Sequence, residues 1–259
     1  MRQHGGMDSS VNDDAMLLDV RIPAPIEEVW LAFREPALIR QWHGWEYPDL
    51  DEEIDFIYQQ RAIAEETSRT LLIGAHAFSL VPSQDDAETL IRMTRRQAAV
   101  DQVEPGIDLD AFRDEIEAGW LSFLQQLRFY FAFHRGQIRH TLYFSGDSTA
   151  PVPAPITKLL KLESVAGDRV HPEYRAQSPG GELTGEVWFH TGSQIGLVVN
   201  EWGPGLALFT YPPSAVTRYG SLTATLTTYG MSSEALADLD QAWTQWWSAN
   251  FKPVQDHPE

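Results

Sequence analysis

Residues 20–42 read Val-Arg-Ile-Pro-Ala-Pro-Ile-Glu-Glu-Val-Trp-Leu-Ala-Phe-Arg-Glu-Pro-Ala-Leu-Ile-Arg-Gln-Trp. Apolar residues occupy every second position from 18 to 22, which is the period of a strand buried on one face. Pro25 suits the first position of a helix, and Pro36 cannot continue one. The stretch therefore predicts a strand followed by two short helices, with proline between them.

The motif Ile-x-Ala-Pro-x-x-x-Val-Trp over residues 22–30, followed later by Trp42, resembles the opening of START-like proteins. It is most similar to the branch named after the activator of the Hsp90 ATPase. The segment Ala-Gly-Trp-Leu-Ser-Phe-Leu over 118–124 resembles the start of the last helix in that family. The resemblance implies an α+β helix-grip fold, in which a curved antiparallel sheet grips a long C-terminal helix and leaves a ligand pocket between them.

The remaining pattern predicts two such units in tandem. Strands are expected at 54–63, 68–74, 76–82 and 88–97, before a long helix that Gly136 ends. The same sequence offset that carries Trp120 onto Trp243 carries strand 18–24 onto 141–147 and helix 26–42 onto 156–165. Further strands are expected at 172–178, 182–191, 194–202, 205–211 and 221–229, before a final helix capped by Ser232 or Ser233. We expect a tail at 1–15, START-like units at 16–135 and 138–252, and a second tail at 253–259.

Composition narrows the class of protein. The chain has 259 residues, of which 43% are hydrophobic, so it can bury a large core. No apolar run is long enough to span a bilayer and no secretory signal is evident, so we expect a soluble cytoplasmic protein. The net charge of −18 repels nucleic acids and anionic membranes, although it permits an acidic docking face for a basic protein partner.

No cofactor or metal is expected. The absence of cysteine excludes thiolate chemistry, and the histidines do not pair at metal-ligand spacing. The chain also lacks a phosphate-binding glycine loop and the Gly-x-Ser-x-Gly motif of hydrolases.

We nominate ligand-binding residues by the face of each expected helix or strand on which they lie. For every aromatic residue, the alternative interpretation is that it belongs to an ordinary hydrophobic core. Arg95 shares strand parity with apolar residues, so it either anchors an anionic or carbonyl-bearing ligand or extends to solvent at the strand end. In the first unit, which we expect to hold the better pocket, the candidates are Trp42, His43, Trp45, Tyr58, Phe78, Met93, Arg95, Trp120, Phe123 and Leu127.

The second unit offers fewer candidates, namely Trp188, His190, Glu201 and Trp243, with Trp202 beside them. Glu201 has the parity of the apolar positions 195, 197 and 199. Pointing inward, it would be a general base or ligand anchor with a raised pKa, whereas the turn at Gly203 would direct it outward.

Three functions are compatible with these features. The first is a noncatalytic protein that binds a hydrophobic small molecule. The second is an enzyme of the cyclase, aromatase or lyase type, acting on an aromatic or polyketide-like substrate with His43, Arg95 or Glu201 as acid or base. The third is a co-chaperone-like interaction protein that works through its acidic surface.

The expected independence from metals and nucleotides can be tested directly. A chelator, ATP or NAD should leave the melting temperature unchanged, because no motif supplies ligands for a metal or a polyphosphate. A thermal-shift assay measures this, and a shift of several degrees with any one additive would contradict the expectation.

Overall fold

The opening strand and its two helices form as the prolines dictate. In the computed structural model, which describes residues 15–96, 109–148, 156–164, 172–211 and 221–254, strand β1 spans Ala15–Ile22. Helix α1 (Ile26–Arg34) begins directly after Pro25, and α2 (Pro36–Ile39) has its proline in the first turn. A proline at that position costs nothing, because the N–H that it lacks would have no intrahelical partner.

The prediction of a strand over 54–63 is wrong. These residues form the end of α3 (Leu50–Ile54) and a π-helical segment, η1 (Asp55–Arg61). The two apolar side chains that the segment buries, Ile54 and Tyr58, are four residues apart and therefore share one helical face. Acidic residues in the first turn of α3 favour the helix, because its N-terminus carries partial positive charge.

The first unit has a five-stranded antiparallel sheet, sheet A, in the order β1-β5-β4-β3-β2. Its other strands are β2 (Ile63–Glu65), β3 (Thr70–Ile73), β4 (His76–Pro82) and β5 (Thr89–Arg95). Phe78 on β4 contacts Phe33 of α1 and Trp120 of the long helix α4 (Leu109–Phe133), so both helices cover the same face of the sheet. The opposite face carries charged side chains such as Asp19 and Arg92, which pair with each other.

The second unit has an eight-stranded antiparallel sheet, sheet B, in the order β13-β6-β12-β11-β10-β9-β8-β7. Its long strands are β6 (Arg139–Ser148), β8 (Glu173–Ser178), β9 (Gly181–His190), β10 (Gln194–Val199), β11 (Gly205–Thr210) and β12 (Ser221–Tyr229). Short elements complete it: α5 (Ile156–Leu159), β7 (Glu163–Ser164), the 3-10 turn η3 (Asn200–Trp202) and β13 (Phe251–Lys252). The helix predicted over 156–165 is thus a single turn.

Helix α6 (Ser233–Asn250) lies across one face of sheet B. Ser232 caps it, since its side-chain oxygen accepts a hydrogen bond from the Ala235 N–H. Trp243 is fully buried among aromatic rings from the sheet, including Phe144 and Phe209. The protein is therefore α+β with two sheet-and-helix units, which confirms the predicted fold class.

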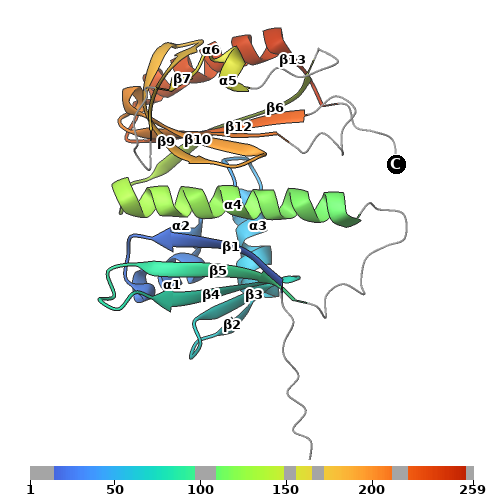
Figure 1. Cartoon of the computed structure of the whole chain (residues 1–259), viewed down its shortest axis with the longest axis vertical. Coiled ribbons are helices and arrows are strands. Elements are labelled where there is room, and N and C mark those ends of the chain that lie inside the picture. Colours follow the sequence, from blue (N-terminus) through green and yellow to red (C-terminus); the bar gives the residue numbers. More distant parts are fainter. Residues whose placement is uncertain (1–14, 97–108, 149–155, 165–171, 212–220, 255–259) are drawn as a thin grey trace, which may run out of the picture.

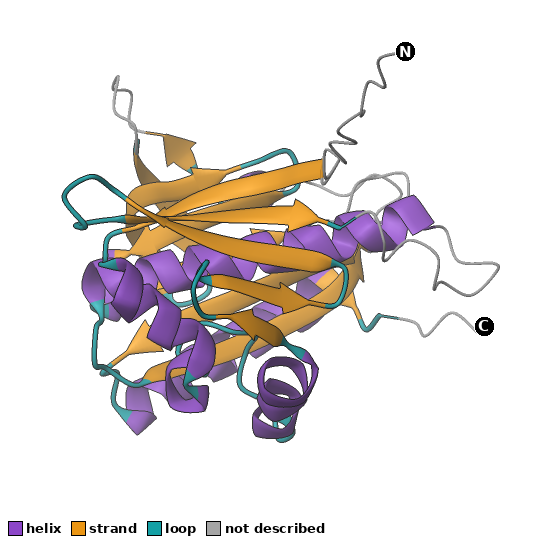
Figure 2. Ribbon diagram, turned by 90° about the horizontal axis from the view of Figure 1, so that it is seen from below, coloured by secondary structure: helices purple, strands orange, loops and turns teal. Residues whose placement is uncertain are grey.

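Helix α4 lies between the two sheets (Figures 1 and 2), an arrangement that the sequence did not predict. Trp120 packs against sheet A, while Phe129, two turns further on, packs against Trp188 of sheet B. Side chains from β9, β10, β11 and β12 accordingly belong to the same hydrophobic cluster as the first unit. Sheet B is thus covered on both faces, by α4 and by α6. None of the helices in the described ranges has the length and apolarity that crossing a membrane would require.

Gly185 is required by the close approach of β9 to β10. A Cβ atom at this position would lie 1.9 Å from the carbonyl oxygen of Val198, so the two strands would have to separate. Gly119 on α4 is the opposite case, because a Cβ there would meet nothing within 4 Å.

We expect Gly185→Ala to destabilise the protein by about 1–3 kcal/mol or more through overpacking. The matched change Gly119→Ala should stabilise it by roughly 0.5–1 kcal/mol, since alanine loses less backbone entropy in a helix. Urea unfolding of both variants measures the difference. Equal effects would contradict the strand contact described for Gly185.

Candidate functional site

Several of the residues predicted for the first-unit pocket converge on His43. Its imidazole ring lies 5.2 Å from the ring of Tyr58 and 4.7 Å from that of Phe123, between centroids. Trp42 and Trp120 each contribute a ring whose centroid lies 6.1 Å from that of His43. The side chain of His43 is only 2% exposed, so these rings enclose it almost completely.

A line of polar side chains runs through this enclosure, in which Tyr58 hydrogen-bonds to His43 and Tyr47 to Glu53, while His43 Nε2 has no hydrogen-bond partner among the described residues. The hydroxyl of Tyr58 lies 3.0 Å from His43 Nδ1, and the half-exposed carboxylate of Glu53 lies 3.6 Å from His43 Nε2. Glu53 in turn accepts a hydrogen bond from the hydroxyl of Tyr47. Burial lowers the pKa of His43, although the adjacent Glu53 opposes this shift, and burial raises the pKa of Tyr58 well above its usual value. At neutral pH the imidazole of His43 and the hydroxyl of Tyr58 are therefore both uncharged.

The other first-unit candidates fill the space between sheet A and α4. Phe78, Met93 and Leu127 are completely buried, as core residues are. Trp45 lies outside this core and stacks on Tyr143 of β6, with ring centroids 3.8 Å apart. The aromatic residues thus pack on one another and on the second unit.

Arg95 faces α4, as its strand parity indicates. Its guanidinium donates to the carboxylate of Glu117 on α4, through Nε at 2.9 Å and through Nη2. His76 lies near the same carboxylate, at 4.0 Å. A side chain of the protein therefore already compensates the positive charge that was expected to anchor a ligand.

Glu201 does not point into the core, which corrects the inward alternative. Strand β10 ends at Val199, and η3 followed by Gly203 with φ of +75° turns the chain outward, leaving Glu201 exposed. Burial alone would raise the pKa of this carboxyl, but hydrogen bonds from the Thr184 side chain and backbone N–H outweigh it, and the pKa is lowered. The structure thus adopts the outward alternative, in which the turn at Gly203 directs Glu201 away from the core and the raised pKa of the inward alternative does not arise.

The other second-unit candidates lie on different surfaces. Trp188 faces α4, where the guanidinium of Arg128 lies 4.0 Å from its ring centroid. The bulged β9 places it on the side of the sheet opposite to Trp243, and His190 is exposed near the end of the strand. These candidates do not meet in one cavity. Among the described residues, no group of three or more His, Asp or Glu side chains is placed to hold a metal ion.

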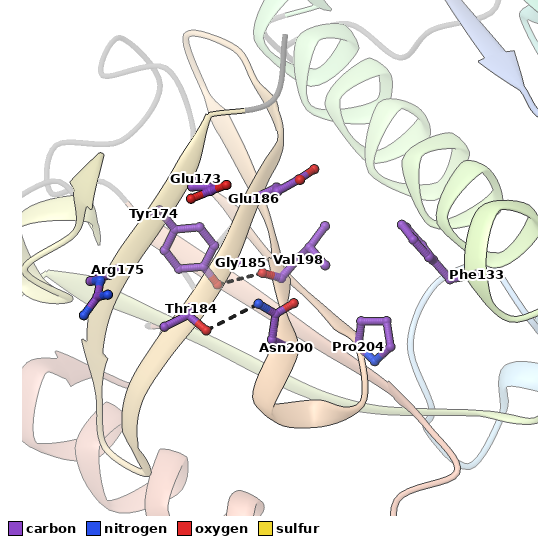
Figure 3. A pocket seen from close by; sticks show the side chains of 10 residues that line it. All are labelled: Phe133, Glu173, Tyr174, Arg175, Thr184, Gly185, Glu186, Val198, Asn200 and Pro204. Carbon is purple, nitrogen blue, oxygen red and sulfur yellow. Dashed lines mark hydrogen bonds between the residues drawn. The ribbon is translucent and has the colours of Figure 1, made fainter. Parts of the chain in front are cut away.

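Two pockets lie in the second unit instead. The larger, of about 600 Å³, is an open groove between β8, β9 and the C-terminal end of α4 (Figure 3). Its polar groups are partly used by the fold, since Tyr174 donates to the carbonyl of Val198 and Asn200 donates to Thr184 Oγ1. Glu173 and Glu186 stand directly opposite each other across the strand pair. Ten residues line the groove: Phe133, Glu173, Tyr174, Arg175, Thr184, Gly185, Glu186, Val198, Asn200 and Pro204.

The smaller pocket, of about 320 Å³, lies between α6, the β8–β9 turn and η3, and we call it the α6 pocket. Its lining residues are Ser178, Gly180, Glu182, Leu183, Glu201, Trp202, Met231, Ala235, Asp238, Leu239 and Ala242.

The composition of α6 explains why space remains there. Residues 235, 238, 239 and 242 share one helical face, and two of them are alanines. Further along, Trp243, Trp246 and Trp247 fill the groove between the helix and sheet B. The change from alanine to tryptophan along α6 is a sequence signal for this pocket. The prediction of the helix depended only on its tryptophans and did not consider the alanines.

Comparisons with known proteins give little. No protein-family profile matches the chain, and no curated protein matches it. One similar solved structure is DynU16, a protein from the dynemicin biosynthetic locus, with 15% identity, a TM-score of 0.27, and coverage of 92% of this chain and 96% of that one. Another is the di-domain ARO/CYC StfQ from the steffimycin biosynthetic pathway, with 12% identity, a TM-score of 0.33, and coverage of 90% and 93%.

The buried imidazole of His43 predicts a pH dependence of stability. In the unfolded chain a histidine takes up a proton near pH 6.5, whereas burial lowers the pKa of His43 in the folded protein. The unfolded state then binds more protons, so stability should fall as the pH drops through about 6.5.

His43→Phe should flatten this dependence between about pH 7.5 and 5.5, measured as melting temperature against pH. His76→Phe is the control, because burial lowers the pKa of His76 too and its share must be separated. A profile for His43→Phe that matches the wild type would contradict the assignment.

Proposed function

We propose that this protein binds a hydrophobic small molecule in the α6 pocket. The observation that carries the proposal is a pocket between a long helix and a curved sheet, walled by Leu183, Trp202, Met231 and Leu239. Its volume of about 320 Å³ lies within the range of small-molecule sites, which are mostly apolar with a few polar groups for orientation.

A buried polar atom without a partner lies next to the wall of the pocket. The indole N–H of Trp243 is buried and has no hydrogen-bond acceptor in the described part of the chain. Its ring centroid lies 6.5 Å from that of Trp202, and Ala242 precedes it on α6. A buried donor without an acceptor costs roughly 1–3 kcal/mol, but Trp243 does not line the pocket, so this atom does not by itself indicate a ligand there.

The second unit is a better candidate than the first. The first-unit aromatic residues enclose His43 and pack against one another, and Arg95 already has Glu117 as its partner. In the second unit, Ala235 and Ala242 of α6 line the pocket beside sheet B. In the first unit, a large side chain of α4, Trp120, packs against sheet A. We therefore propose that the ligand pocket lies in the second unit and not, as the sequence led us to expect, in the first.

Binding is better supported than catalysis. A carboxylate acts best as a general base when its pKa is raised toward neutrality. Glu201 lines the α6 pocket, but its pKa is lowered and its two oxygens accept hydrogen bonds from Thr184. It is thus a stable anion and a weak base.

We also infer a START-like origin by tandem duplication, with domains at 16–135 and 138–252. The Ile-x-Ala-Pro-x-x-x-Val-Trp motif at residues 22–30 supports the family and its Hsp90-activator branch. The duplication is supported by a long helix in each unit that buries a tryptophan, Trp120 or Trp243, against a sheet.

A fluorescent probe tests the proposed pocket. N-phenylnaphthylamine is apolar and uncharged, and its emission rises when it leaves water. We expect saturable binding by the wild-type protein. Ala242→Phe, which fills the pocket, should weaken it about tenfold or more, equivalent to roughly 1.4 kcal/mol.

Ala237→Phe is the matched control, because Ala237 is exposed on the same helix and does not line the pocket. It should bind the probe as the wild type does, and circular dichroism should show both variants folded. Equal binding by the two variants, or none by the wild type, would overturn the proposal.

A further inference from the structure

Among the residues that the structure describes, the charged groups that line the α6 pocket are all acidic. Three carboxylate residues, Glu182, Glu201 and Asp238, contribute to its wall, and none of its eleven lining residues is Lys, Arg or His. They come from three elements that the fold brings together, namely β9, η3 and α6. The whole chain has a net charge of −18, which adds to the same field.

The carboxylate of Glu201 is held in place. Its Oε2 accepts from the Thr184 N–H at 2.9 Å, and its Oε1 accepts from the Thr184 hydroxyl at 2.6 Å. Asn200 donates to the same hydroxyl, which fixes the position of the Thr184 side chain. Each oxygen of Glu201 keeps acceptor capacity for a ligand, since a carboxylate oxygen can accept two hydrogen bonds.

In the described part of the chain, one cationic side chain, Arg175, pairs with a carboxylate of this wall. Arg175 lies 3.7 Å from Glu182, but both side chains are more than half exposed, so solvent screens the pair. Arg175 lines the groove of Figure 3 and not the α6 pocket.

The N-terminus of α6 also faces this region, since Ala235 in its first turn lines the pocket. A helix terminus carries only about half an elementary charge. Ser232 caps one of its N–H groups and Glu234 adds a negative charge in the first turn, so this partial positive charge is offset.

Resting on the proposed function, we propose that the α6 pocket selects amphipathic ligands that carry a cationic amine and rejects anionic ones. The apolar side chains of Leu183, Met231 and Leu239 would hold the hydrocarbon part. The amine would face the carboxylates of Glu201 and Asp238, and the buried indole of Trp202 offers it a π face. This selectivity is the reverse of that expected for an arginine-anchored site.

Octylamine, octanol and octanoate test the proposal, because they share a chain and differ in the charge of the head group. Each competes with N-phenylnaphthylamine for the wild-type protein at about neutral pH. Octylamine should displace the probe at a concentration about tenfold or more below that of octanoate, with octanol between them. The difference should shrink as salt is added.

Three variants locate the effect. Asp238→Asn and Glu201→Gln should each reduce the preference for octylamine over octanoate at least about threefold and leave displacement by octanol unchanged. Asp240→Asn is the control, because this exposed carboxylate lies on the same helix outside the pocket and removes the same net charge. It should keep the wild-type preference.

The outcomes separate the two proposals. If octanol and the probe bind but octanoate competes as well as octylamine, the charge selectivity is wrong and the pocket stands. If Asp240→Asn lowers the preference as much as Asp238→Asn does, the net charge of the protein and not the pocket selects the ligand. If neither octanol nor the probe binds, the proposed function itself fails.

Discussion

The two-sided burial of α4 is the constraint on which the rest of this structure depends. One side of the helix closes the core of sheet A, and the other packs on sheet B (Figure 1). At the junction the guanidinium of Arg139 is buried and donates to the carbonyls of His43 and Gly44 and to Gln126 on α4. Burial lowers the pKa of Arg139 to about 10, so it remains charged at neutral pH. A buried charge is costly unless it is hydrogen-bonded, so these bonds from the two Nη atoms hold the two units together, while Nε has no partner among the described residues.

That constraint explains why the two units differ. The first unit presents α4 to its neighbour, and its aromatic residues pack closely around His43. In the second unit, α6 has one face on sheet B and the other in solvent. It can therefore carry alanines near its N-terminal end without loosening the contact between the units. The packing around α4 and the pocket beside α6 thus belong to different parts of the protein.

Periodicity predicted most elements because it reflects local geometry. Alternation at 18–22 and the positions of Pro25 and Pro36 gave the opening strand and helices, and the stripe around Trp243 gave α6. The same method failed at 54–63, where apolar residues four apart are compatible with a helix as well as a strand. It also placed Glu201 by strand parity, although the strand had already ended two residues earlier.

The sequence by itself determined the α+β class, the two units and the burial of Trp120 and Trp243, because each follows from local spacing and burial of apolar surface. Strand parity left the side chain of Arg95 either inward or extended to solvent. Only the tertiary structure decided that Arg95 meets Glu117, that α4 lies between the sheets and that the pocket opens beside α6. These depend on side chains far apart in the chain, whose meeting is set by sheet curvature and helix packing. The carboxylates of the α6 pocket belong to three elements, so no single stretch of sequence reveals their shared field.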